Sequence, residues 1–97
     1  MFTIELSDDA LDELRRFRKR DSRMIFDEIE QQLTYQPTVE ARNRKPLRAH
    51  PLGEWELRVG KFRVFYDIDT EHETVLVKAV AAKIGNKLFI RGEEFLL

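Results

Sequence analysis

Two arginines, Arg58 and Arg63, lie on either side of the dipeptide Gly60-Lys61 and are the residues best placed to bind an anion. Apolar and polar residues alternate on both sides of this dipeptide, and glycine at the first position of a two-residue turn favours a type II′ β-hairpin. Such a turn fixes the register, so that Arg58 lies directly opposite Arg63. Opposed residues share one face of a sheet, where like charges repel but two adjacent guanidinium groups can bind a phosphate or a carboxylate.

The same register divides the remaining side chains of the hairpin between two faces. Glu56 and Phe65 oppose each other on the face of the two arginines, and Asp67 follows on that face. Glu56 and Asp67 could instead neutralise the arginines in a cross-strand network. Phe65 could stack on a base or be covered by the C-terminal segment. The face expected to pack on the helices carries Trp55, Leu57, Val59, Phe62, Val64 and Tyr66.

Cations are concentrated around this hairpin. Between Arg42 and Arg63, seven basic residues face only two glutamates, which gives this span a charge of +5 although the chain carries a formal −1. Such a patch can bind phosphate groups, although a solvated, arginine-rich loop has the same composition. A second basic run, from Arg15 to Arg20, is better explained by the preference of cations for the C-terminal end of a helix than by contact with RNA.

The composition is that of one small domain of 97 residues, with 42% hydrophobic and 36% charged residues. Cysteine is absent, which excludes disulfides and thiolate metal sites and agrees with a reducing compartment. His50 and His72 lie far apart in the sequence, so we expect no metal site and no cofactor. No apolar run is long enough to cross a bilayer and no signal-peptide pattern is present, so we expect a cytoplasmic protein without a membrane partner.

The spacing of apolar residues predicts the elements that position these side chains. Residues 2–6 alternate as in a strand, Ser7 is the expected N-cap of a first helix, and a second helix must end before Pro37. Residues 38–53 lack periodicity and are expected to form a surface connection, with helical turns possible. Further strands are expected over residues 54–59, 62–68, 74–82 and 87–91. We therefore predict one α+β domain over residues 1–97, with an N-terminal strand and an αα-hairpin packed on one face of a mainly antiparallel, twisted sheet of four to five strands.

Four stretches of the sequence carry a resemblance to known proteins. They are the opening FTIELSDDALDEL, the pair Pro46-Leu47, the segment WELRVGKFRVFYDID from Trp55 to Asp69, and the following TVLVKAVAAK. Together they resemble the RelE/ParE superfamily of bacterial toxins, the toxic halves of toxin–antitoxin pairs, and the pattern W-E-L-R-x-G-x-[FY]-R-V-x-Y is typical of it. The similarity extends over about residues 2–90, and it is strongest to RelE-like or plasmid-stabilisation toxins.

The resemblance implies a ribosome-dependent mRNA endonuclease that inhibits translation. RelE-type members bind the ribosomal A site, where the 2′-hydroxyl of the RNA attacks the adjacent phosphate. By this resemblance Arg63 and Arg58 contact the phosphate, and Glu56, at a position that is basic in RelE, could act as general base if Arg58 or Arg63 orients it. The tyrosine or histidine that such enzymes carry near the C-terminus is absent, and His50 could replace it. The other cations expected to bind RNA phosphates are Arg42, Arg44, Lys45, Arg48, Lys61, Lys83 and Lys87.

Two other functions fit the same resemblance, so whether the chain is an enzyme stays open. A ParE-type poison of DNA gyrase would trap its target without catalysis, and the near-neutral charge and the missing tyrosine favour it. A relative that has lost toxicity would retain only partner binding. All three predict a cognate antitoxin that folds on the toxin. The apolar tail from Phe95 to Leu97 could form part of the antitoxin surface or simply cap the core.

Overall fold

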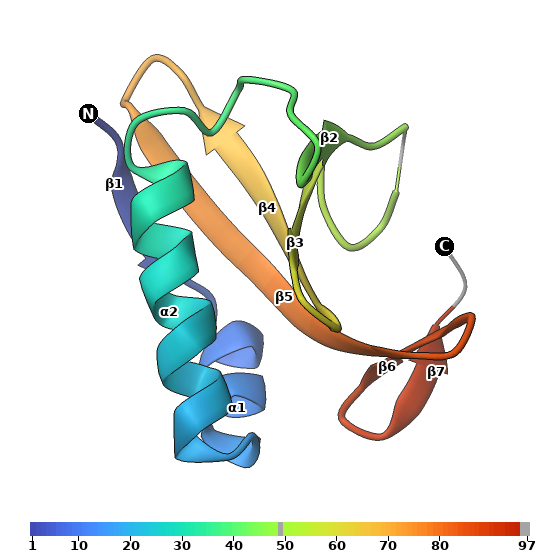
Figure 1. The fold of residues 1–97 in the computed structure, drawn as a ribbon. Helices are drawn as coiled ribbons and strands as arrows, with labels where there is room; N and C mark the ends of the chain where they lie inside the picture. Colours follow the sequence, from blue (N-terminus) through green and yellow to red (C-terminus); the bar gives the residue numbers. More distant parts are fainter. Residues whose placement is uncertain (49, 96–97) are drawn as a thin grey trace.

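The computed structural model describes residues 1–48 and 50–95 and has the predicted α+β architecture (Figure 1). Two helices lie against one face of an open, twisted sheet, to which the described residues contribute seven strands. In these two ranges no helix is both long and apolar enough to cross a membrane. The elements are β1 (Thr3–Leu6), α1 (Asp8–Arg16), α2 (Lys19–Leu33), β2 (Arg44–Pro46), β3 (Trp55–Val59), β4 (Phe62–Asp69), β5 (Thr74–Ile84), β6 (Lys87–Ile90) and β7 (Glu93–Phe95).

Strand β5, with 11 residues, is the centre of the sheet. It pairs antiparallel with β4 along one side, and along the other side it pairs first with β1, in parallel, and then with β6. The register with β4 shifts between Phe65 and Tyr66, which leaves Lys78 as an extra residue in β5. An extra residue of this kind bends a strand, and β5 curves strongly in Figure 1.

Strands β2 and β7 add to the four to five strands that the sequence predicts. Each is three residues long, which is too short for an alternating pattern to indicate it. Strand β2 extends the sheet beyond β3, and β7 closes a hairpin with β6. The rest of the order, β3-β4-β5-β6 with β1 beside β5, contains the strands expected from the sequence.

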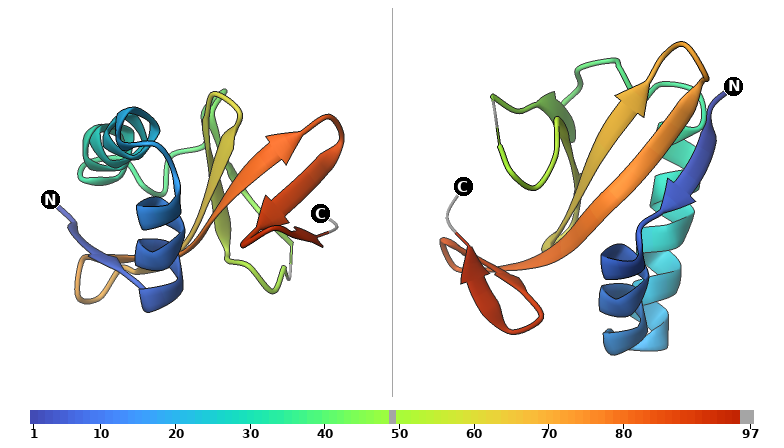
Figure 2. Two further views of the ribbon diagram at one scale, coloured as in Figure 1. Left: turned by 90° about the horizontal axis from the view of Figure 1, so that it is seen from below. Right: turned by 180° about the vertical axis from the view of Figure 1, so that it is seen from behind.

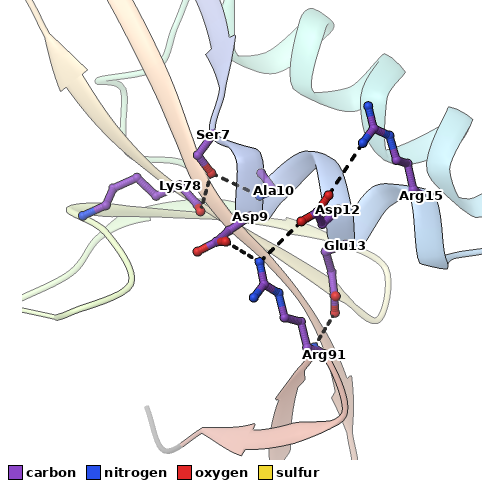
Figure 3. Close-up of polar contacts among 8 residues, drawn as sticks. All are labelled: Ser7, Asp9, Ala10, Asp12, Glu13, Arg15, Lys78 and Arg91. Atoms are coloured by element: carbon purple, nitrogen blue, oxygen red, sulfur yellow. Dashed lines mark hydrogen bonds and ion pairs between the residues drawn. The ribbon is translucent and has the colours of Figure 1, made fainter.

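The predicted N-cap Ser7 begins helix α1 and also ties it to the sheet (Figure 3). The Ser7 hydroxyl oxygen accepts a hydrogen bond from the Ala10 N–H at 3.1 Å, and the hydroxyl donates to the Lys78 carbonyl at 2.8 Å. A capping side chain of this type stabilises a helix by about 1 kcal/mol. Because its second partner is the bulged residue of β5, the same side chain fixes the position of α1 on the sheet.

The turn between β6 and β7 is attached to α1 by polar contacts (Figure 3). The main-chain N–H of Arg91 donates to Glu13 Oε2 at 2.8 Å, and its guanidinium pairs with Asp9 and Asp12. Glu13 is 4% exposed, and its second oxygen has no hydrogen-bond partner among the described residues. Arg91 has a φ of 55°, a left-handed value that is uncommon for a residue other than glycine. The C-terminal hairpin is therefore tied to the helical layer.

The main core lies between the helices and the sheet, on what we call the helix face. The face of the β3–β4 hairpin that the register assigned to the core is buried there, with Trp55 packed at its edge. The Tyr66 hydroxyl donates to the Pro37 carbonyl at 2.8 Å, and burial raises the pKa of this phenol above its usual value. The buried side chains that the hairpin contributes are Leu57, Val59, Phe62, Val64 and Tyr66.

A second, smaller cluster covers the opposite side of the sheet, which we call the back face. Phe65 is its fully buried centre, surrounded by side chains of β5 and β6. The connection between β2 and β3 contributes Leu47 and Leu52, and β7 contributes Phe95. Figure 2 shows the helices on one side of the sheet, with the C-terminal hairpin and the β2–β3 connection on the other. Part of the back face is therefore closed to solvent.

Candidate functional site

The predicted opposition of Arg58 and Arg63 is confirmed. The two residues are directly paired between β3 and β4, and the neighbouring pairs agree with the predicted register, including Glu56 with Phe65. Gly60 has a φ of 57°, as the first residue of a type II′ turn requires. Arg58 and Arg63 consequently lie on the back face together with Glu56.

The resemblance implied that Arg58, Arg63 and Glu56 act on a substrate phosphate, but two of these three side chains are buried. Arg63 is 7% exposed and Glu56 is 2% exposed, whereas Arg58 is exposed. Phe65 is fully buried beneath its cluster, and the His50 ring stacks on it with 6.0 Å between ring centroids. Phe65 is therefore covered and is no open platform for a base. Cover by the C-terminal segment, one of the two alternatives for Phe65, is confirmed by Phe95 in its cluster. The β2–β3 connection also covers this cluster, and no local pattern indicated that contact.

Two cations hold the Glu56 carboxylate from opposite sides. Arg63 Nε lies 3.7 Å from one carboxylate oxygen, and Lys45 Nζ lies 3.6 Å from the other. Arg63 Nη1 also donates to the carbonyls of Gly60 and Phe62, at 2.9 Å each. Burial lowers the pKa of the Arg63 guanidinium, and the negative charge of Glu56 opposes that shift. Arg63 thus fixes the hairpin turn and orients Glu56, and it does not project into solvent.

A pocket of about 280 Å³ opens beside this carboxylate. Strand β2 forms one wall because Lys45 is paired with Glu56 and the Asn43 carbonyl accepts the Arg58 N–H at 2.8 Å. Three cations and two carboxylates, of which Glu56 is buried and Glu40 is exposed, line a space large enough for part of a nucleotide. The arrangement can hold an anion against guanidinium groups while a carboxylate accepts a proton. The lining residues are Glu40, Ala41, Arg42, Asn43, Lys45, Glu56 and Arg58.

Arg44, expected to bind RNA, is buried at 5% exposure on the helix face. Its guanidinium donates to the Val39 carbonyl at 3.0 Å and to the Gln32 carbonyl and side-chain oxygen at 3.2 and 2.6 Å. The expectation of an accessible phosphate ligand is wrong here because alternation along β2 places Arg44 opposite Leu57. Arg44 instead satisfies carbonyls around the end of α2, where a cation is favourable.

The remaining predicted cations are dispersed. Lys61 lies at the hairpin turn with Nζ 5.4 Å from the centre of the Phe62 ring, and its carbonyl accepts the Lys83 N–H at 2.7 Å. Arg48 is exposed in the β2–β3 connection. Lys87 pairs with Glu94 at 3.7 Å across the C-terminal hairpin. Of the predicted set, the structure brings Arg42 and Lys45 to the pocket with Glu56 and Arg58.

Asn43 and Glu40 line the pocket, although the sequence did not indicate them. Both reach it because β2 pairs with β3, and β2 has no pattern that predicts a strand. The one available signal was the proximity of these two residues in sequence to the cations of the basic span. Proximity of that kind does not distinguish a wall residue from Arg44, which points to the other face.

Two helices on one face of a mainly antiparallel sheet form the fold that this chain shares with solved structures of RelE-type toxins. A family model described as "ParE toxin of type II toxin-antitoxin system, parDE" matches residues 4–82. The chain therefore belongs to the ParE toxin family of type II toxin–antitoxin systems.

Solved structures of RelE-type toxins share this fold. The toxin–antitoxin complex RelBE2 from Mycobacterium tuberculosis has a chain that is 28% identical, with a TM-score of 0.73 over 84% of this chain and 98% of that chain. The isolated RelE toxin of E. coli is 19% identical, with a TM-score of 0.70 over 87% of this chain and 86% of that one. The RelE–RelB complex from Pyrococcus horikoshii is 17% identical, with a TM-score of 0.69 over 84% and 94%. None of the curated proteins matches the sequence.

Proposed function

We propose that this toxin inhibits translation by cutting mRNA on the ribosome. The proposal rests on the buried Glu56 carboxylate, held between Arg63 and Lys45 in a cationic pocket. A carboxylate with a fixed orientation is a suitable general base, and the exposed Arg58 beside it is a suitable ligand for the phosphate that reacts. No metal or other cofactor is part of the proposed reaction.

The reaction is a transesterification within the RNA. Glu56 takes the proton of a 2′-hydroxyl, whose oxygen forms a bond to the adjacent phosphorus while the bond from phosphorus to the 5′-oxygen breaks. The products are a 2′,3′-cyclic phosphate and a free 5′-hydroxyl, which takes a proton from Lys45. Arg58 and Arg42 stabilise the charge that develops on the phosphate oxygens. Arg63 is a positioning residue, because its contacts are with Glu56 and with carbonyls of the turn.

The partner that restrains the toxin is, in this proposal, a cognate antitoxin. The chain belongs to a toxin family of type II toxin–antitoxin systems, and structures of the similar proteins from M. tuberculosis and P. horikoshii contain toxin and antitoxin together. Antitoxins of this kind fold on their targets and cover them. The site of action is the ribosome, which places the toxin in the cytoplasm and requires no membrane contact.

Toeprinting on programmed ribosomes tests this function with three matched variants. Glu56→Gln should reduce the rate of cleavage by about 10²- to 10⁴-fold, since it removes the base and keeps the shape. Arg58→Gln should reduce it by about 10²- to 10³-fold, and this exposed position should leave the melting temperature unchanged. Lys78→Gln is the control, because Lys78 is also on the back face but pairs with Asp67 outside the pocket. Intact mRNA in the presence of active wild-type toxin would remove the proposal.

A gyrase poison is the second candidate. The matching family model is named for ParE, and the net charge of −1 is low for a protein that must bind ribosomal RNA. In this case the pocket would bind a carboxylate or phosphate of gyrase or its DNA without catalysis. Purified toxin would then trap gyrase–DNA complexes and induce a DNA damage response while mRNA stays intact. Expression without either effect would favour a toxin fold that retains only antitoxin binding.

A further inference from the structure

The corner between α1 and α2 carries a dense run of exposed basic residues. From Arg15 to Arg23 the chain carries six cations and one carboxylate, Asp21. Arg15 pairs with Asp12 at 3.6 Å, and its neighbours Arg16 to Arg20 form no ion pair with any carboxylate of residues 1–48 or 50–95. The cations of this corner that are exposed are Arg15, Arg16, Arg18, Lys19, Arg20 and Arg23.

Helix-end electrostatics explains only part of this cluster. Arg15 and Arg16 lie in the last turn of α1, where cations are favourable. Arg18, Lys19 and Arg20, by contrast, occupy the N-cap and first turn of α2, where the helix dipole is positive and repels them. The N-cap Arg18 makes no side-chain capping bond. Three cations therefore stand where they weaken the helix, so the fold alone gives no reason for them.

This corner adjoins the tip of the β3–β4 hairpin. The ring of Phe17, between the two helices, lies 4.8 Å from that of Phe62, and Lys61 lies over the same Phe62 ring. From Lys61 the hairpin leads within three residues to Arg58 at the candidate pocket, and the Lys61 carbonyl binds the Lys83 N–H. The α1–α2 turn and the hairpin tip lie toward the same end of the molecule (Figure 1). The basic corner therefore adjoins the tip of the hairpin whose strand β3 carries Arg58 at the pocket.

We propose that this surface is a track for single-stranded RNA and leads the strand into the candidate pocket. Its residues, which we call the basic belt, are Arg16, Arg18, Lys19, Arg20 and Lys61. The belt passes from the helix face around the hairpin tip to the back face, and a flexible strand follows such a bend more easily than a rigid duplex. Guanidinium groups bind phosphates in bidentate pairs, and three of these five residues are arginines.

A protein partner fits the belt less well. The centres of protein interfaces are depleted of charge and contain aromatic or aliphatic anchors, whereas nucleic-acid interfaces are polar and positive. The belt has four cations between Arg16 and Arg20, and the aromatic ring among them, Phe17, already packs on Phe62. The identity of the strand as RNA rests on the proposed function, but the belt is independent of Glu56 and of catalysis.

The test measures binding of a fully 2′-O-methylated, unstructured RNA of about 16 nucleotides, which covers known site sizes of small domains. This RNA has no 2′-hydroxyl to attack, so the wild-type toxin binds without cutting it. Fluorescence anisotropy across a salt series gives the slope of log Kd against log salt. Each lost phosphate contact on a single strand lowers that slope by about 0.7, so the variant R18Q/K19Q/R20Q should lower it by about 2. Its melting temperature should equal or exceed that of the wild type, because repulsion at the start of α2 is removed.

The control K78Q/K87Q/R91Q removes the same charge from side chains that already pair with carboxylates. It should keep the wild-type slope. Equal slopes for the belt variant and the wild type would overturn the proposal, as would tighter binding of duplex DNA or of polyaspartate than of the RNA. The variant E56Q separates this inference from the proposed function, because it should bind the RNA with the wild-type slope and yet fail to cleave mRNA. A lower slope for the belt variant alone, together with no mRNA cleavage by the wild type, would leave the belt and remove the endonuclease.

Discussion

Replacing Arg44 by alanine should destabilise the protein strongly and leave its RNA contacts intact. The side chain is 5% exposed and donates to the carbonyls of Gln32 and Val39 and to the Gln32 side chain. A hydrogen bond from a charged donor contributes about 1.5–3 kcal/mol. Taking the lower value for each of the two main-chain acceptors gives a loss of about 3 kcal/mol. The hydrogen bond to the Gln32 side-chain oxygen adds to this loss.

The expected change in melting temperature follows from the size of the domain. For 97 residues the entropy of unfolding at the melting temperature is about 0.2 kcal/mol per kelvin, so a loss of about 3 kcal/mol lowers the melting temperature by about 15 °C. Thermal unfolding followed by circular dichroism measures this directly. Arg44→Lys should lie between the wild type and Arg44→Ala, because a single ammonium group cannot reach acceptors on both sides of a guanidinium.

Arg42→Ala is the matched comparison. Arg42 is an exposed arginine two residues away that lines the candidate pocket. It should change stability by less than about 0.5 kcal/mol and should weaken RNA binding. A reversed result, with Arg44→Ala as stable as the wild type and deficient in RNA binding, would show that the Arg44 side chain does not lie on the helix face.

Three further changes probe other parts of the fold. Gly53→Ala places a Cβ 3.0 Å from the main-chain nitrogen of Tyr66 and should destabilise by about 1–3 kcal/mol in urea unfolding; an unchanged midpoint would contradict this close approach. A hydrogen bond from His72 lowers the pKa of Asp69, which therefore contributes stability above its unfolded-state pKa and loses it as pH falls through the folded one. His72→Ala should raise that pKa toward the ordinary value in an NMR titration, and an unshifted resonance would exclude the contact. Arg91→Gly relieves a backbone strain of about 1 kcal/mol at the left-handed φ and removes exposed ion pairs that stabilise the fold by about 1 kcal/mol. The two effects oppose each other, so the melting temperature should barely change. A large drop would mean that the ion pairs contribute more than the strain costs.

The hairpin could be predicted from the sequence because its determinants are local. A two-residue turn with glycine first sets the register, and alternation then assigns each side chain to a face. For this reason the opposition of Arg58 and Arg63 and the buried set from Leu57 to Tyr66 agree with expectation. The N-cap Ser7 is local in the same sense, since its helical partner lies three residues away.

The accessibility of the site could not be predicted because it depends on distant segments. Whether Glu56 and Arg63 are exposed is decided by Lys45 from β2 and by the cluster that packs around Phe65. The side of the sheet on which Arg44 lies is decided by the pairing of β2 with β3. Alternation within a three-residue strand does not specify that pairing, and proline at one end of β2 argues against a strand.

The net charge of −1 conceals a difference of charge between the two ends of β4. The β4–β5 turn carries Asp69, Glu71 and Glu73, whereas the opposite end of β4 adjoins Lys61 and the α1–α2 corner. Figure 1 shows the β4–β5 turn and the β3–β4 turn at opposite ends of β4. A protein with this distribution is oriented by the field of an anionic target before contact, and its acidic end faces away. The basic belt and the pocket would therefore meet an RNA strand first. The carboxylates of the β4–β5 turn lie farther away, and salt screens their charge over roughly 8 Å at physiological ionic strength. For this reason the total charge is a poor guide to RNA binding by this protein.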